Sequence, residues 1–174
     1  MFSILKPLLF KMDPEIAHDL AIKSLKLNYL PESIFKVEDE EILKINLLNK
    51  TFSNPIGLAA GFDKSAEVYN SIYKLGFSFV EVGTVTPLGQ YGNPKPRIFR
   101  LEKDEALINR LGFNNDGLEK VTQRLQKNSP TNFLGINIPN TKAATGIKDY
   151  MERIFEKTSF KASLTEAERE RFLI

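Results

Sequence analysis

The chain has 174 residues, of which 42% are hydrophobic and 26% charged, and this composition is typical of a soluble domain with a buried core. Its net charge of +2 is too small to indicate a nucleic-acid partner. The sequence holds no cysteine and one histidine, which excludes disulfides, thiolate catalysis and metal sites rich in Cys or His. We therefore expect no metal site.

Residues 1–36 predict a helical hairpin. Asp13, Pro14 and Glu15 form a typical helix start, because Asp caps a helix, Pro suits its first position and Glu suits the positive end of its dipole. The apolar residues of this segment cover more than one narrow stripe, which leaves two interpretations open: packing onto the main domain, or a helix pair lying on a membrane surface. No stretch reaches the roughly 18 consecutive apolar residues of a spanning helix.

Residues 54–64 are the stretch around which the rest of the chain is organised. An apolar run of strand length ends in Ala59, Ala60 and Gly61, and such small side chains let a flat or phosphorylated ligand approach the backbone. Lys64 then places a cation at the rim. Ligands of parallel α/β folds bind at the carboxyl ends of the strands. The stretch therefore predicts a ligand wall followed by a charge.

A strand, a helix of about ten residues and a second strand predict a βαβ unit and hence a parallel sheet. Polar groups near the strand ends would meet on one face of a parallel barrel, and without a carboxylate pair or a Ser-His pair they indicate cofactor chemistry. The first elements expected after the N-terminal segment are a half-buried strand at 43–47 and a turn into residue 51. After residues 54–64 we expect a helix over 65–75, a strand over 77–84 and a Gly/Pro-rich loop over 87–96. The last expected elements are a hairpin that pairs 97–101 with 106–109, a helix capped by Asp116 and a strand over 133–138.

Residues 109–117 contain three Asn, one Arg and two Gly. Such a loop is dense in amide donors and acceptors, but Asn is also a common turn residue, so a binding loop and a plain turn both stay open. His18, on the second predicted helix, is a lone histidine of the kind that usually lies at a surface or has its hydrogen bonds satisfied within the fold, so a ligand role needs other support.

Several long motifs resemble class 2, quinone-dependent dihydroorotate dehydrogenase. They are MDPEIAH (12–18), NPIGLAAGFDK (54–64), VGTVTP (82–87), GNPKPR (92–97) and INRLGFNNDG (108–117). The resemblance implies an α/β fold: the N-terminal part of a TIM (β/α)8 barrel that holds flavin mononucleotide (FMN), preceded by the helical hairpin. It also implies oxidation of dihydroorotate to orotate in pyrimidine biosynthesis, with a serine base taking a proton, the flavin taking a hydride, and ubiquinone or menaquinone accepting the electrons.

The same resemblance assigns site residues and a location. The hairpin is expected on the cytoplasmic side of the cell membrane, as a peripheral attachment that admits the quinone, with His18 in the quinone tunnel. The implied flavin contacts are Ala60, Gly61, Phe62, Asp63, Lys64, Thr84 and Asn137. The implied substrate contacts are Lys64, Asn109, Arg110, Leu111, Gly112 and Phe113.

The chain also departs from the family pattern. The family's catalytic serine segment is absent, so no catalytic residue is assigned. Residues 139–142 suggest either a variant of the loop after the third strand, which we favour, or the serine segment without its serines. A TIM barrel takes ~250 residues. We therefore expect a truncated, inactive chain with a hairpin at 1–36, part of the barrel at 37–157 and a charged helix at 158–174. The alternatives are a non-catalytic membrane-associated fragment and a flavin barrel with another substrate.

Overall fold

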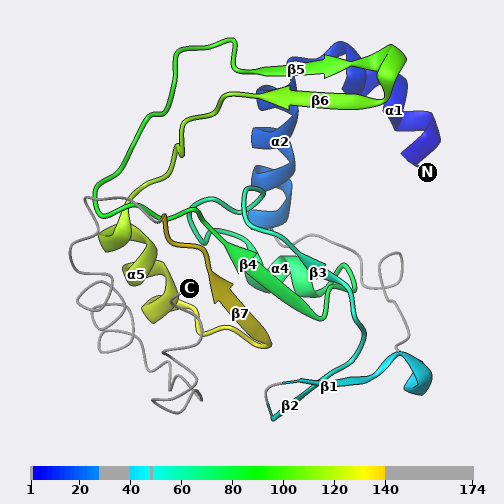
Figure 1. Cartoon of the computed structure of the whole chain (residues 1–174), viewed down its shortest axis with the longest axis vertical. Helices are drawn as coiled ribbons and strands as arrows, with labels where there is room; N and C mark the ends of the chain where they lie inside the picture. The colour runs from blue at the N-terminus through cyan, green and yellow to red at the C-terminus, as the bar shows by residue number, and fades with distance from the viewer. Residues whose placement is uncertain (1, 28–39, 48, 140–174) are drawn as a thin grey trace.

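The structure is a computed structural model and describes residues 2–27, 40–47 and 49–139 (Figure 1). The predicted helix at 158–174 and the loop at 140–142 lie outside these residues. Figure 1 shows a parallel sheet between two antiparallel hairpins, one at each end of the molecule. The helices are α1 (Phe2–Lys11), α2 (Pro14–Lys26), η1 (Glu41–Leu43), α4 (Tyr69–Tyr73), η2 (Glu102–Asp104) and α5 (Leu118–Lys127). The strands are β1 (Ile45–Leu47), β2 (Lys50–Phe52), β3 (Gly57–Leu58), β4 (Phe79–Val82), β5 (Ile98–Leu101), β6 (Ala106–Asn109) and β7 (Phe133–Ile136).

The parallel sheet has the order β3-β4-β7, and each connection contains one α-helix, α4 between β3 and β4 and α5 between β4 and β7, as the βαβ pattern predicts. Val80 of β4 pairs with Leu58 of β3 on one side and with Leu134 of β7 on the other. The described residues therefore form an open sheet of three parallel strands rather than a closed barrel. The α/β part of the predicted fold class is confirmed.

The core lies between this sheet and the helices. Val80 and Val82 of β4, Ile72 of α4 and Val121 of α5 are at most 1% exposed. Burial of one such side chain contributes about 1.5–3 kcal/mol to folding. Because the core holds β4 against both crossover helices, it fixes where the carboxyl ends of the three strands lie.

The helix predicted over 65–75 is shorter than expected. It begins at Tyr69, because Ala66 has a left-handed φ of 54° and the residues before α4 form a turn. The carboxylate of Asp63 accepts hydrogen bonds from the backbone N–H groups of Glu67 (2.7 Å) and Val68 (2.8 Å) and fastens that turn. The helix ends at Tyr73, and Gly76, at φ 96°, closes the following turn by donating its N–H group to the carbonyl of Tyr73 at 3.0 Å.

The predicted capping of α5 by Asp116 is wrong. The residue at the N-cap is Gly117, which provides no side-chain cap. Asp116 instead accepts a hydrogen bond from Nη2 of Arg124 at 2.5 Å. The face of this helix that packs on the core carries Val121 and Leu125, which are both buried.

The two helices predicted in this segment are present as α1 and α2, and α2 packs onto the main domain through one face. Asp13 caps the helix by accepting from the N–H groups of Glu15 (2.9 Å) and Ile16 (3.0 Å). Ile22 and Leu25 are buried in the core. The opposite side of α2 exposes 56% of Ile16, 47% of Leu20 and 65% of Leu27. Within the described residues, neither this helix nor another has the length and apolar character to cross a bilayer.

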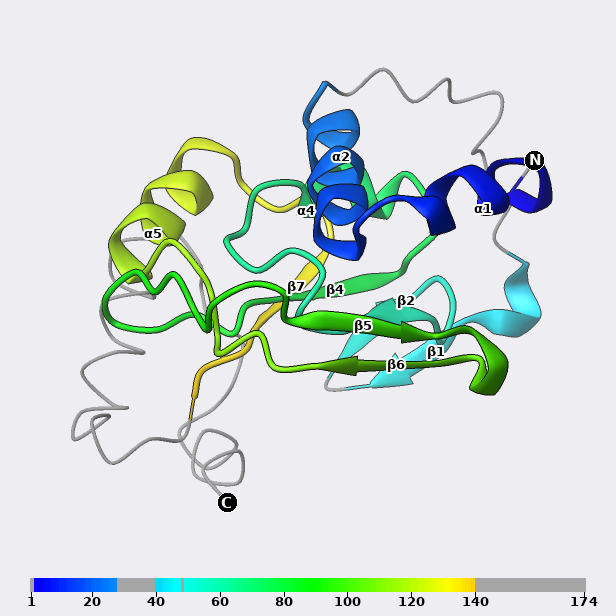
Figure 2. The same cartoon turned by 90° about the horizontal axis from the view of Figure 1, so that it is seen from above.

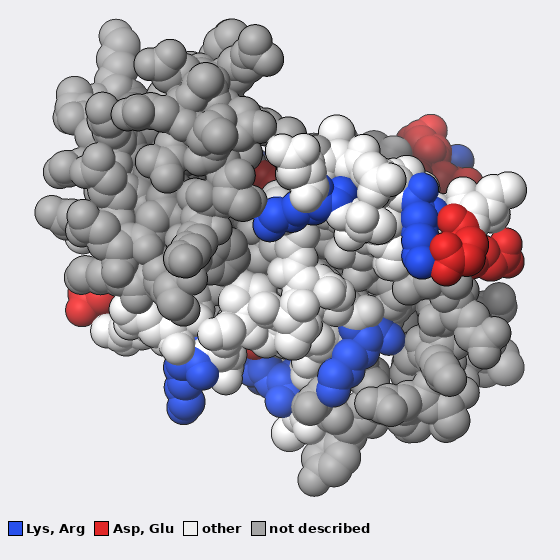
Figure 3. All heavy atoms as spheres, turned by 90° about the horizontal axis from the view of Figure 1, so that it is seen from below, with Lys and Arg blue, Asp and Glu red and all other residues white. Residues whose placement is uncertain are grey.

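Phe52 packs the β1–β2 hairpin against the parallel sheet, and the ammonium of Lys50 lies 4.9 Å from the centroid of the Phe133 ring. Phe52 is 6% exposed, and its ring meets the edges of Phe79 of β4 and Phe133 of β7 at centroid distances of 5.6 and 5.4 Å. The strand predicted at 43–47 is confirmed over Ile45–Leu47, but its predicted half-buried face is wrong, because Leu43 lies in η1 and both Leu43 and Leu47 are exposed. Figure 3 views this end from below and shows Lys and Arg side chains scattered among uncharged residues.

Candidate functional site

Backbone hydrogen bonds continue past the ends of the parallel strands and bring three predicted site segments together. Gly61 N–H donates to the carbonyl of Gly83 at 2.9 Å, and Gly83 N–H donates to the carbonyl of Asp63 at 3.0 Å. Val85 N–H donates to the carbonyl of Asn137 at 2.9 Å. The predicted meeting of the segments after β3, β4 and β7 is therefore confirmed, and it rests on main-chain contacts.

Two glycines shape this junction in different ways. Gly61 has a φ of 110°, and a Cβ atom there would meet nothing within 4 Å, so the wall is open at this point, next to the half-buried Ala60. Gly83 has a φ of 114°, and a Cβ atom there would lie 2.7 Å from the carbonyl oxygen of Asn137. Only glycine fits the second position, because both its φ and the close approach of Asn137 exclude a side chain.

Thr84 and Asn137 form a polar pair at the same junction. Thr84 Oγ1 donates to Asn137 Oδ1 at 2.6 Å, and Asn137 Nδ2 donates to a carboxylate oxygen of Glu81 at 2.9 Å. This chain of bonds fixes which end of the Asn137 amide faces Thr84. The sequence offered no signal for Glu81 as the third member, because it lies within a strand.

Lys64 turns away from that junction and toward α2. Its ammonium lies 3.1 Å from Nε2 of His18, and the ring of His18 meets the ring of Phe62 edge-on at a centroid distance of 5.2 Å. Burial lowers the pKa of Lys64, and burial together with the nearby ammonium lowers the pKa of His18. These three side chains line a cavity of about 470 Å³ between α2 and the loops after β3 and β4.

Asp63 lines the same cavity but offers little to a ligand. Its side chain is almost completely buried, and its carboxylate faces the N–H groups of its own turn. Burial raises the pKa of Asp63, while those N–H groups act in the opposite direction. Asp63 therefore shapes the loop that carries Lys64.

A buried ion pair closes one side of the cavity. Glu15 of α2 and Arg97, just before β5, are bonded through Nη2 and Oε1 and again through Nε and Oε2 at 3.0 Å. The Arg97 hydrogen bond lowers the pKa of Glu15, and Glu15 raises that of Arg97. Arg97 also donates to the carbonyls of Tyr91 (2.5 Å) and Asn93 (3.0 Å). The sequence predicted Glu15 only as a partner of the helix dipole.

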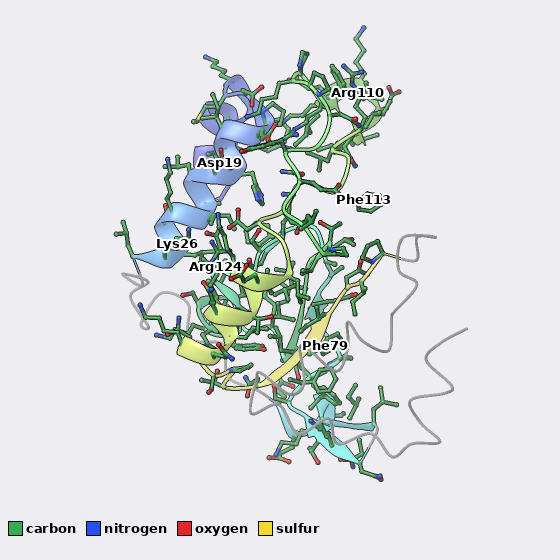
Figure 4. The ribbon with its side chains drawn as sticks, turned by 90° about the vertical axis from the view of Figure 1, so that its left-hand side faces the viewer. Asp19, Lys26, Phe79, Arg110, Phe113 and Arg124 are labelled. Carbon is green, nitrogen blue, oxygen red and sulfur yellow. The ribbon has the colours of Figure 1, made fainter. Side chains whose placement is uncertain are left out.

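The predicted substrate loop, 109–113, does not line this cavity. Asn109 and Arg110 are exposed, and Phe113 is 59% exposed. In Figure 4, Arg110 and Phe113 lie to the right of Asp19 and Lys26 of α2, while Figures 1 and 2 place the loop after β6 beside the carboxyl end of β7. The loop therefore lies apart from the cavity that Lys64 lines.

Other asparagines hold the substrate loop in place. Asn93 Nδ2 donates to the carbonyl of Arg110 at 2.7 Å. Asn115 is 8% exposed, donates to Thr86 Oγ1 and to the carbonyl of Phe113, and accepts from two N–H groups. The Oδ1 atom of Asn114, which lines the cavity, is the one buried side-chain oxygen or nitrogen without a partner in the described part of the chain. The loop thus combines turn-forming and solvent-facing asparagines.

Metal binding has no support in the described ranges, which contain no group of three or more His, Cys, Asp or Glu side chains placed to hold an ion. The chemistry that the arrangement offers is recognition. It presents an open backbone wall, a polar hydroxyl–amide pair, a half-buried ammonium and an exposed amide-rich loop.

Comparison with known proteins identifies the family. The sequence model described as dihydroorotate dehydrogenase matches residues 42–166. Dihydroorotate dehydrogenase (quinone) from Idiomarina loihiensis is 45% identical over 155 residues, which are 87% of this chain and 46% of the relative. The protein of that name from Bartonella henselae is 52% identical over 147 residues, which are 84% of this chain and 40% of the relative.

A solved structure agrees. The crystal structure of DHODH from Eimeria tenella in complex with ferulenol superposes with a TM-score of 0.71 at 44% identity, covering 84% of this chain and 41% of that one. The chain thus spans less than half the length of these relatives. On the match to the family model and on these similarities, the chain belongs to the dihydroorotate dehydrogenase family.

Proposed function

We propose that the chain forms part of the flavin and substrate site of a quinone-dependent dihydroorotate dehydrogenase, which oxidises dihydroorotate to orotate in pyrimidine biosynthesis. The observation that carries the proposal is the meeting of Gly61, Thr84 and Asn137 at the carboxyl ends of adjacent parallel strands. In this proposal β3, β4 and β7 are three neighbouring strands of a (β/α)8 barrel, whose ligands bind at that end.

The residues at this junction fit FMN. The open wall at Gly61 and Ala60 allows a flat ring to approach the backbone, and Thr84 and Asn137 offer hydrogen-bonding groups to a heterocycle. Lys64 is a half-buried cation, and an anionic group beside it would compensate the desolvation that lowers its pKa. When bound, FMN supplies the ring that accepts a hydride.

The chain's own residues would bind and orient the reactants. The side chain of Asn109 is exposed at the end of β6 and suits the amide edge of a pyrimidine, with Arg110, Leu111, Gly112 and Phe113 completing this side of the substrate pocket. Lys64 suits the carboxylate of orotate. His18 and Phe62 line the cavity beside α2, where we place the entry of ubiquinone or menaquinone.

Flavin binding tests the proposal directly. FMN added to the 174-residue chain is expected to lose fluorescence on binding, and Thr84→Val is expected to weaken binding roughly fivefold through the loss of one hydrogen bond. Thr51→Val removes a hydroxyl from the exposed β1–β2 hairpin and is the matched control. The proposal fails if no FMN binds, or if both variants reduce affinity equally.

Turnover is a separate measurement. Because the sequence contains no family serine segment, we propose that the chain binds orotate without sustaining the oxidation of dihydroorotate. Flavin-loaded chain is mixed with dihydroorotate and a quinone or dye acceptor, and orotate is measured. Steady production of orotate would contradict this part of the proposal and leave the binding site intact.

We also propose that the hairpin attaches the protein peripherally to the cytoplasmic face of the cell membrane. The support is the exposed row of Ile16, Leu20 and Leu27 along α2. Co-sedimentation with phospholipid vesicles is expected to fall when these three residues are changed to Ser. Ile42→Ser, at a residue 86% exposed in η1, is the control. An equal loss of vesicle binding in the triple variant and in the control would contradict attachment through α2. Vesicle binding without flavin binding would favour a non-catalytic membrane-associated fragment.

A further inference from the structure

A side-chain hydrogen bond joins the hairpin to the loop that follows β3. Nζ of Lys64 lies 3.1 Å from Nε2 of His18. An ammonium group has three donors and no acceptor, so Nε2 must be the acceptor. The imidazole that makes this contact is therefore neutral, with its proton on Nδ1.

The position of the imidazole is fixed from a second direction. Phe62, two residues before Lys64, presents its ring to His18 at an interplanar angle of 80°. One short loop therefore contributes both the ring against His18 and the ammonium bonded to it. Lys64 is half-buried and lines the cavity beside His18.

The surrounding charges leave this contact in place. Glu15 and Asp19 of α2 and Glu67 in the loop after β3 act on the imidazole or the ammonium, as do Asp63 in that loop and Arg97 before β5. Glu15 is paired with Arg97, and Glu67 is paired with Lys26. Asp63 faces its own turn. Glu15, Glu67 and Asp63 are therefore engaged elsewhere, and Asp19 acts on His18 and Lys64 through its charge.

We propose that His18 is a positioning residue for Lys64: its imidazole holds the ammonium on the α2 side of the cavity until an anionic group of the bound flavin or substrate draws Lys64 away. The identity of that ligand rests on the proposed function, whereas the contact itself does not. Release of Lys64 would free the Nε2 lone pair toward the cavity. Ligand binding at Lys64 and protonation of His18 would then be linked, and the linkage would be reciprocal.

The single histidine of the chain makes the test direct, because its ring gives unambiguous nitrogen resonances in NMR. In the flavin-free wild type, the tautomer with Nδ1 protonated and Nε2 accepting is expected at neutral pH. Lys64→Met is expected to raise the pKa of His18 by roughly half a unit or more, because a neighbouring cation is removed. Lys23→Met removes a cation that lines the same cavity from α2 and is expected to shift the pKa by less than about 0.2 unit.

The proposal would be overturned if the wild type showed the opposite tautomer of His18, or if the two variants shifted the pKa of His18 equally. The tautomer is measured on the wild type, so this part of the test does not depend on whether a variant folds. The second part of the experiment adds FMN and measures the pKa of His18 again. Flavin binding detected by fluorescence is expected to raise the pKa of His18 in the wild type and to leave it unchanged in Lys64→Met. Binding without such a shift would refute the linkage. Absence of binding would count against the proposed function, while the flavin-free arm still decides whether His18 holds Lys64.

Discussion

Glu15 joins two parts of the chain that are 82 positions apart in sequence. Its backbone N–H group is capped by Asp13, and its carboxylate is bonded to Arg97, whose side chain is 7% exposed. Lys95 lies 3.4 Å from the same carboxylate. One residue therefore fixes the start of α2 and the loop before β5 together.

Removal of this carboxylate should be costly. Glu15→Gln leaves Arg97 buried without a counter-charge, and the free energy of unfolding is expected to fall by about 3 kcal/mol near neutral pH. Since the folded-state pKa of Glu15 lies below its ordinary value, the ion pair contributes above pH 4.5 and is lost as the pH falls through the folded-state pKa. Urea unfolding at pH 7 and at acidic pH measures both effects.

The matched control is Glu41→Gln, which breaks the exposed pair of Glu41 with Lys44. Surface pairs contribute about 0–1 kcal/mol, so a small change is expected at either pH. An equally small effect of Glu15→Gln would show that the Arg97 pair adds nothing to stability.

Asp63 should give the opposite pH dependence. Burial raises its folded-state pKa above 3.8, so the folded state keeps the proton longer than the unfolded state does. The contribution of Asp63 to the free energy of unfolding therefore falls as the pH rises from 3.8 through the folded-state pKa. Asp63→Asn is expected to abolish this contribution to the pH dependence of the free energy of unfolding, which urea unfolding at a series of pH values measures. Asp104→Asn, at an exposed residue, is the control. Parallel curves for wild type and Asp63→Asn would contradict the assignment.

At the scale of residues, the sequence predicted the site best where a small or polar group follows a strand. Thr84 and Asn137 meet as expected, because the parallel register dictates their position. Asp116 could not be assigned correctly, because capping and pairing with Arg124 compete for the same carboxylate. Only the three-dimensional placement of α5 decides that competition.

At the scale of elements, Phe52 is the buried residue of β2. Phe52→Ala removes both edge-to-face contacts and leaves a cavity against Phe79 and Phe133, so the free energy of unfolding is expected to fall by about 3–5 kcal/mol. Leu47→Ala, in the other strand of the hairpin, removes a side chain that is 56% exposed and should cost far less. Thermal or urea unfolding of both variants checks the difference, and similar losses would contradict an anchoring role for Phe52.

The bounds of α4 show why element lengths were harder to predict than element types. Apolar spacing through residues 66–73 suits a helix, and Ala66 has a high intrinsic helix propensity. Asp63 nevertheless bonds the N–H groups of Glu67 and Val68 and holds the preceding residues in a turn. A side chain outside the predicted helix thus determined where the helix begins.

At the scale of the whole molecule, the protection of backbone amides against hydrogen exchange should decrease outward from β4. This strand is bonded on both sides, and its Val80 and Val82 are buried, whereas every residue of β6 is exposed. Native-state hydrogen exchange is expected to be slower in β4 than in β6 by roughly two orders of magnitude or more after correction for intrinsic rates. Equal protection would show that the sheet and the β5–β6 hairpin open as one unit.

The molecule-scale arrangement was only partly predictable. The βαβ spacing predicted parallel strands, and the motifs predicted which strand ends carry polar groups. The packing of α2 against the loop after β3 could not be foreseen, because it depends on Lys26 with Glu67 and on Ser71 donating to the carbonyl of Leu25. Contacts between side chains so distant in sequence leave no periodic signal.

The two tyrosines of α4 give the protein an optical reporter of its own. Tyr69 and Tyr73 donate to the backbone carbonyls of Asn128 and Phe133, and burial raises the pKa of Tyr69 to about 12 and also raises that of Tyr73. The chain has five tyrosines and no tryptophan, so its near-ultraviolet spectrum is dominated by phenol groups. In an alkaline titration, these two phenols should ionise after exposed ones, and their tyrosinate absorbance should appear together with detachment of α4.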